Sequence, residues 1–102
     1  PEGKAGNLAM VYNGYLEVPS DGVYTFSLLS DDGSILKLDD QVLIENDGLH
    51  SPAERSAQVA LAAGKHKLEL SYFDYFGGVL TLYLINEEGE KTECPSEWLK
   101  HE

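Results

Sequence analysis

The chain has 102 residues, of which 42% are hydrophobic; this is enough for one modest core and too few for two domains. The 18 Asp and Glu against 7 Lys and Arg give a formal net charge of −11, which disfavours phosphate backbones and anionic lipid as partners. We therefore expect no nucleic-acid partner, and no membrane insertion because no apolar run has the length of a membrane span. Cys94 is the only cysteine, which excludes an internal disulfide and a zinc site built from paired cysteines.

Apolar and polar residues alternate over short runs, and Gly, Pro, Asn or Asp interrupt the runs at intervals of about 8 to 12 residues. The turn Pro19–Gly22 is expected to close a first hairpin, and Asp39-Asp40 a second, tight hairpin, although Asp-Asp in place of the usual Asp-Gly leaves a looser turn open. The unbroken apolar run 79–85 suggests a strand buried on both faces. The predicted fold is all-β, an antiparallel β-sandwich, with strands at residues 15–18, 22–29, 35–38, 42–44, 57–61, 67–73 and 79–85.

Two segments between these strands carry chemistry. Ser30–Ser34 contains the adjacent carboxylates Asp31 and Asp32 and is expected at the edge of a sheet, where it is either a simple β-turn or a cation site. The stretch between Glu45 and Arg55 has no periodicity and is expected to be the longest surface loop of the chain. Both segments are candidates for a functional site.

Six short motifs follow one another along the chain: Tyr24–Ser27, Ser30–Ser34, Leu36–Asp39, Asn46–His50, Leu61–His66 and Leu70–Asp74. Their order and spacing resemble the protective-antigen domain family (PA-14), over roughly Gly14 to Ile85. The tail Cys94–Leu99 also resembles the closing segment of glycosidase-linked members, whereas the family's aromatic-rich first strand is absent or reduced to Leu8–Tyr12. The resemblance implies one module over residues 1–102, with a core at 14–85 and a tail, 86–102, that packs on the sandwich.

In the adhesin branch of that family, an Asp-Asp pair holds a calcium ion that itself ligates sugar hydroxyls. The resemblance therefore implies a Ca²⁺ site formed by Asp31, Asp32 and Asp74, completed by a carbonyl such as that of Phe76. Asp74 stands where the branch has Asn. Calcium takes about six to eight oxygen ligands, so three carboxylates suit it. The alternative is that the acidic pair serves turn geometry without a metal.

The expected sugar site comprises residues of the long loop and of the turn after strand 67–73. An exposed aromatic can stack on a pyranose face while carboxylates accept its hydroxyl protons. His50 has two interpretations, a sugar contact or a solvated loop residue. His66 is interpreted as structural, and Trp98 as an anchor of the tail. The predicted sugar-binding residues are Asn46, Asp47, His50, Tyr75 and Phe76.

Catalysis is not expected, since the acid and base of a glycosidase flank the scissile bond at a separation that neighbouring Asp31 and Asp32 cannot provide. The resemblance implies a non-catalytic carbohydrate-binding module of a secreted, periplasmic or surface-exposed bacterial protein. The partners are then a glycan and a catalytic domain of the same parent chain. The alternative function is a structural module that packs on a catalytic domain and shapes its active-site mouth. In that case the loop 46–52 faces the partner.

Overall fold

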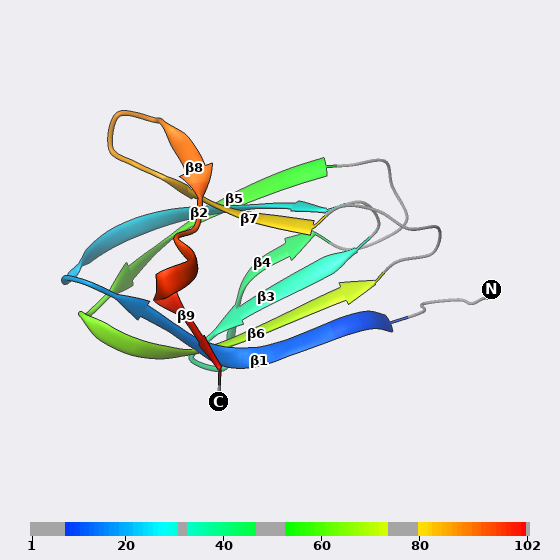
Figure 1. Cartoon of the computed structure of the whole chain (residues 1–102). Coiled ribbons are helices and arrows are strands. Elements are labelled where there is room, and N and C mark those ends of the chain that lie inside the picture. Colours follow the sequence, from blue (N-terminus) through cyan, green and yellow to red (C-terminus); the bar gives the residue numbers. More distant parts are fainter. Residues whose placement is uncertain (1–7, 31–32, 47–52, 74–79, 102) are drawn as a thin grey trace.

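The computed structural model describes residues 8–30, 33–46, 53–73 and 80–101, and it is an antiparallel β-sandwich, as predicted. One sheet has five strands in the order β4-β3-β6-β1-β9, and the other has four in the order β5-β2-β7-β8 (Figure 1). The elements are β1 Leu8–Val18, β2 Gly22–Ser30, β3 Ser34–Leu38, β4 Gln41–Asn46, β5 Ala53–Leu61, β6 Gly64–Phe73, β7 Leu80–Ile85, β8 Lys91–Glu93, the 3₁₀ turn η1 Ser96–Trp98, and β9 Leu99–His101.

The predicted tight hairpin of β3 and β4 is confirmed. Leu38 pairs with Gln41, so only Asp39 and Asp40 form the turn. Their φ angles are 52° and 68°, the left-handed values that a two-residue turn of the primed type requires. Aspartate adopts this region more readily than most residues, because its short side chain bonds locally. Asp39 Oδ1 indeed accepts the amide of Lys67 at 3.1 Å.

The predicted hairpin of β1 and β2 is wrong. β1 pairs with β6 and β9 in one sheet, while β2 pairs with β5 and β7 in the other. The turn at Pro19–Asp21 therefore carries the chain between layers. Proline and glycine provide the same turn angles whether the turn joins two paired strands or two sheets, so the turn sequence does not determine which strands pair. β1 is also longer than the sequence suggested, running from Leu8 to Val18 as an interior strand whose ladder with β6 has an irregularity between Leu8 and Met10.

The core lies between the two sheets and follows the period-2 alternation of the strands. β7 departs from the prediction: all six of its residues are half-buried, so it is not buried on both faces. Its neighbour β8 is only three residues long and covers little of it. The buried apolar side chains that form the main cluster are Leu16, Val18, Phe26, Leu28, Leu36, Leu38, Ile44, Leu61, Leu68 and Cys94.

The C-terminal tail is part of both sheets. β8 extends the four-stranded sheet, the chain then crosses through η1, and β9 pairs with β1 in the other sheet (Figure 1). The indole of Trp98 meets the ring of Tyr24 edge-on at a centroid distance of 5.9 Å. The prediction that this tail docks on the sandwich is confirmed. No helix within the described ranges has the length and apolar character of a membrane span.

Candidate functional site

The segments that carry the candidate residues begin and end at one end of the sandwich. Ser30, the last residue of β2, lies opposite Ala53 at the start of β5 and Leu80 at the start of β7. Ser34, the first residue of β3, lies opposite Asn46 at the end of β4 and Tyr72 near the end of β6. The strand residues that flank segments 31–32, 47–52 and 74–79, which we call their anchors, therefore lie together, although these segments are far apart in sequence (Figure 1).

The strands flanking Asp31 and Asp32 are interior strands, which corrects the expectation of a sheet edge. β2 lies between β5 and β7, and β3 lies between β4 and β6. Because β2 and β3 belong to different sheets, the chain passes from one layer to the other between Ser30 and Ser34. Ser30 and Ser34 themselves lie beside the ends of four further strands, β4, β5, β6 and β7.

A buried polar network ties these anchors together. Ser30 Oγ and Ser34 Oγ are 2.8 Å apart, and both side chains are fully buried. Asn46 Nδ2 donates to Ala53 O at 2.8 Å and lies 3.2 Å from Ser30 Oγ and 3.3 Å from Leu28 O. Since a buried donor without an acceptor is costly, the network fixes the relative positions of β2, β3, β4 and β5.

Asn46 is placed differently from the expectation of a loop residue that contacts sugar. It is the last residue of β4, and its side chain is 1% exposed. Its amide nitrogen bonds to acceptors of β2 and β5, so in this arrangement the Asn46 side chain joins β4 to these strands and does not face a ligand. Sequence reasoning missed Ser30 and Ser34 as its partners, because the register that makes them neighbours is set by strand pairing.

The other candidate residues lie outside the described ranges. Within those ranges, no three His, Cys, Asp or Glu side chains cluster as metal ligands. The chemistry of the three segments nevertheless suits a cation, because they contain four aspartates and neither lysine nor arginine. The candidates in these segments are Asp31, Asp32, Asp47, His50, Asp74, Tyr75 and Phe76.

A second polar cluster on the outer face of the four-stranded sheet is internally satisfied. Glu54 accepts from Lys91 Nζ at 2.9 and 3.0 Å and from Ser27 Oγ at 2.5 Å. The hydrogen bond from Lys91, with that from Ser27, lowers the pKa of the Glu54 carboxyl. Lys91 also lies over the ring of Tyr83, at 4.6 Å from its centroid. The cluster joins β5 to β8 across the sheet, and we assign it a structural role.

His66 is likewise structural, in agreement with the sequence analysis. Its Nε2 lies 2.7 Å from Ala62 O, and its Nδ1 lies 2.7 Å from Asp39 Oδ2. The carbonyl of Ala62 and the carboxylate of Asp39 together raise the pKa of His66, against the smaller effect of burial. This pair links the β3–β4 turn to β6 at the opposite end of the sandwich from the candidate site.

The sequence profile of the PA14 domain matches residues 1–98. The chain belongs to the PA14 domain family. The resemblance deduced from the motifs is thereby confirmed. No curated protein sequence matches the chain.

Several solved structures share this fold. The "PA14 sugar-binding domain from RTX adhesin" is 27% identical, with a TM-score of 0.75 over 88% of this chain and 52% of that one. An anti-sigma factor domain-containing protein from Clostridium clariflavum is also 27% identical, with a TM-score of 0.76 over 90% and 32%. The β-glucosidase from Kluyveromyces marxianus, solved with glucose, is 19% identical, with a TM-score of 0.63 over 76% and 10%, and supports the fold alone.

The PA14 domain thus has neighbours described as sugar-binding and neighbours within glucosidases. The chain spans between 32% and 52% of the first four solved structures that it matches.

Proposed function

We propose that this PA14 domain is a non-catalytic carbohydrate-binding module whose glycan site is formed by segments 31–32, 47–52 and 74–79. The observation that carries the proposal is the meeting of their anchors at one end of the sandwich, through the register of Ser30 and Ser34. Loops gathered at the end of a rigid β-scaffold are a common location for binding residues. The likeness to a sugar-binding PA14 domain at 27% identity adds support.

Calcium is proposed as the ion of this site. Asp31, Asp32 and Asp74 would provide carboxylate ligands, and the Phe76 carbonyl a further oxygen. A bound Ca²⁺ would supply positive charge and open coordination positions for sugar hydroxyls. Without a cation, four aspartates on three neighbouring segments would repel one another, and those segments contribute neither lysine nor arginine to offset them.

The sugar would contact Asp47, His50, Tyr75 and Phe76. Asn46 takes a supporting part, because its buried amide holds the last residue of β4 against Ala53 O, the first residue after segment 47–52. A binding loop anchored at both ends loses less conformational entropy when it orders around a ligand. The network therefore favours a site that is already arranged before the glycan arrives.

We further propose that the domain works outside the cytoplasm as part of a longer protein. Its parent would be a glycoside hydrolase or a surface glycan-binding protein, bacterial as the sequence analysis expected. The adhesin of which it covers 52% supports this context. The packing-module alternative differs in one measurable property, since a module that only shapes a neighbouring active site has no glycan affinity of its own.

Thermal unfolding with excess calcium and with chelator tests the ion first. An ion that binds only the folded chain stabilises it by roughly 2.7 kcal/mol when its concentration is about 100 times its Kd. The Asp32→Asn variant should lose this shift while keeping its melting temperature in chelator. Asp40→Asn is the matched control, because it makes the same change in the turn at the opposite end of the sandwich.

A glycan array probed in calcium and in chelator then tests the ligand. Calcium-dependent retention that Asp32→Asn abolishes and Asp40→Asn preserves is the expected result. A calcium shift without any retained glycan would favour the packing module. No calcium shift for the parent chain would remove the ion from the proposal, and glycan retention in chelator would then still support a metal-free sugar site.

A further inference from the structure

The four-stranded sheet is incomplete beside the first residues of β2. All nine residues of β2 pair with β5, from Gly22 opposite Leu61 to Ser30 opposite Ala53. On its other side, the ladder with β7 starts only at Thr25, which lies opposite Ile85. Residues 22–24 therefore have a strand on one side and none on the other, because the chain turns away after Ile85.

The backbone at this edge has no substitute partner. In the described ranges, no backbone hydrogen bond outside the ladders involves Gly22, Val23 or Tyr24. Successive residues of an antiparallel strand point their N–H and C=O groups to alternate sides, so part of the groups of residues 22–24 face β5 and the others face the open side. Another extended chain can pair with the groups on the open side. Three residues of strand span roughly 10 Å.

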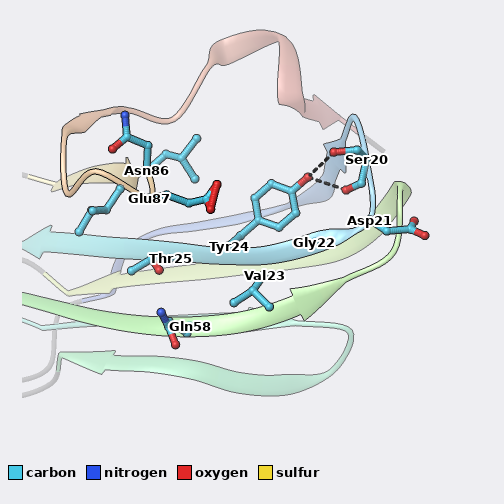
Figure 2. Close-up of a pocket in the computed structure, with 11 residues that line it drawn as sticks. Ser20, Asp21, Gly22, Val23, Tyr24, Thr25, Gln58, Asn86 and Glu87 are labelled. Atoms are coloured by element: carbon cyan, nitrogen blue, oxygen red, sulfur yellow. Dashed lines mark hydrogen bonds between the residues drawn. The ribbon is translucent and has the colours of Figure 1, made fainter.

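A cavity of about 800 Å³ lies along this edge (Figure 2). It is bordered by the turn before β2 and by Asn86 and Glu87 in the turn after β7. We call it the strand-edge cavity. It lies at the end of the sandwich opposite Ser30 and Ser34, and thus away from the proposed glycan site.

Internal hydrogen bonds hold the walls of the strand-edge cavity in place. Tyr24 Oη donates to Ser20 O at 2.5 Å, and the amide of Ala63 donates to Asp21 Oδ1 at 2.7 Å. On the opposite wall, Asn86 Nδ2 donates to Glu90 Oε1 at 2.9 Å, and the Glu90 amide donates to Asn86 Oδ1 at 2.8 Å. Both turns are thus fixed in positions that leave the edge of β2 open.

The side chains around the cavity indicate what it would hold. Glu87 places a carboxylate on the wall after β7, whereas the Asp21 carboxylate points away and accepts the Ala63 amide (Figure 2). Neither lysine, arginine nor histidine lines the cavity. Val23 is 68% exposed on the outer face of the sheet. Gln58, opposite Thr25 on that face, is exposed and makes no side-chain hydrogen bond within the described residues. Apolar, amide and acidic groups together suit an extended chain with a basic residue.

A saccharide fits these walls less well. Stacking on a pyranose needs an open aromatic face, and Tyr24 is the one aromatic residue among the lining residues. Its ring stacks on Phe26 at 6.3 Å and meets Trp98 edge-on at 5.9 Å, while its hydroxyl is bonded to Ser20. The aromatic surface is therefore already used inside the protein.

We propose that the strand-edge cavity binds a basic, extended peptide segment of a partner protein, which adds to the sheet beside residues 22–24. The segment takes the position that β7 would occupy if it were three residues longer. Its main chain pairs with the open edge of β2, and a lysine or arginine reaches Glu87. The protein would then hold a glycan at one end and a polypeptide at the other.

The test uses a panel of acetylated, amidated hexapeptides in which lysine alternates with Val, Thr or Tyr. Amide hydrogen exchange should show new protection at residues 22–24, and fluorescence anisotropy should give a Kd. Peptides of equal charge with proline at alternate positions should not bind, because they lack the amides needed for the ladder. Glu87→Lys should weaken binding about tenfold, whereas Glu88→Lys, outside the lining, should leave it within about twofold.

Three results would overturn the proposal. The first is an absence of protection at residues 22–24 with every member of the panel. The second is equal affinity for the proline peptides, or an equal loss in Glu87→Lys and Glu88→Lys, since either would mean unspecific attraction to an acidic protein. The third is protection of the same amides by oligosaccharides and not by peptides, which would make the cavity a second sugar site.

Discussion

Replacing Asn46 by alanine should cost far more stability than the loss of one polar side chain usually does. One hydrogen of its side-chain amide is donated to Ala53 O at 2.8 Å. The other is shared between Ser30 Oγ at 3.2 Å and Leu28 O at 3.3 Å. Asn46 is 1% exposed, so water cannot readily replace it, and the carbonyls lose their donor. At about 1 to 2 kcal/mol for each buried bond, the expected loss is roughly 3 kcal/mol. For a domain of this size that lowers Tm by roughly 12 to 24 °C.

Asn86→Ala is the matched control. Asn86 also makes two side-chain hydrogen bonds, at 2.9 and 2.8 Å to Glu90, but it is exposed, so water can satisfy the groups that it leaves. Its loss should stay below about 1 kcal/mol. Urea unfolding followed by the emission of Trp98, the only tryptophan, measures both variants. Equal losses in the two variants would refute the argument from burial.

Three further predictions concern other parts of the fold. Gly14→Ala should destabilise by about 1 to 3 kcal/mol, because the added Cβ would lie 2.2 Å from Lys100 O and push β9 from β1; unchanged urea unfolding would contradict this. The pKa of His66 is raised in the folded protein above its ordinary value of 6.5, so His66 contributes fully to the free energy of unfolding below pH 6.5. This contribution is lost as pH rises through the folded-state pKa, so the free energy of unfolding should fall between pH 6 and 8, and less so in His66→Gln. Burial raises the pKa of Cys94 to about 11, so at pH 8 only about one thiol in a thousand is ionised. A thiol reagent should therefore label the folded chain much more slowly than the urea-unfolded chain, and equal labelling rates would contradict this prediction.

Local patterns predicted the strands well. Alternation in Gly22–Leu29 and Lys67–Phe73 located β2 and β6, because a strand that is buried on one face needs that pattern wherever it lies. The hairpin of β3 and β4 was predictable for a related reason, since its partners are separated by only two residues. The docking of Trp98 followed from its apolar size in a polar tail.

Predictions that depended on partners distant in sequence were less successful. The run 79–85 is apolar along its length, yet β7 is only half-buried, because its burial depends on how far β8 and the opposite sheet extend. The same limit applied to Asn46, whose sequence context is a loop and whose actual environment is a buried network with Ser30. The acidic residues of the candidate site were visible in the sequence, but the meeting of their anchors was not.

By itself, the sequence determined the class of fold, the family motifs and the kinds of side chain available to a site, because these depend on residue type and short-range spacing. Only the tertiary structure decided that β1 and β2 lie in different sheets, that Asn46 is internal, and that three residues of β2 have no neighbouring strand on the β7 side. The physical reason is that a turn such as Pro19–Gly22 has nearly the same local energy whether it joins two paired strands or two layers. The choice is made by the long ladders of β1 with β6 and β2 with β5, whose backbone pairing and shared core outweigh any local preference.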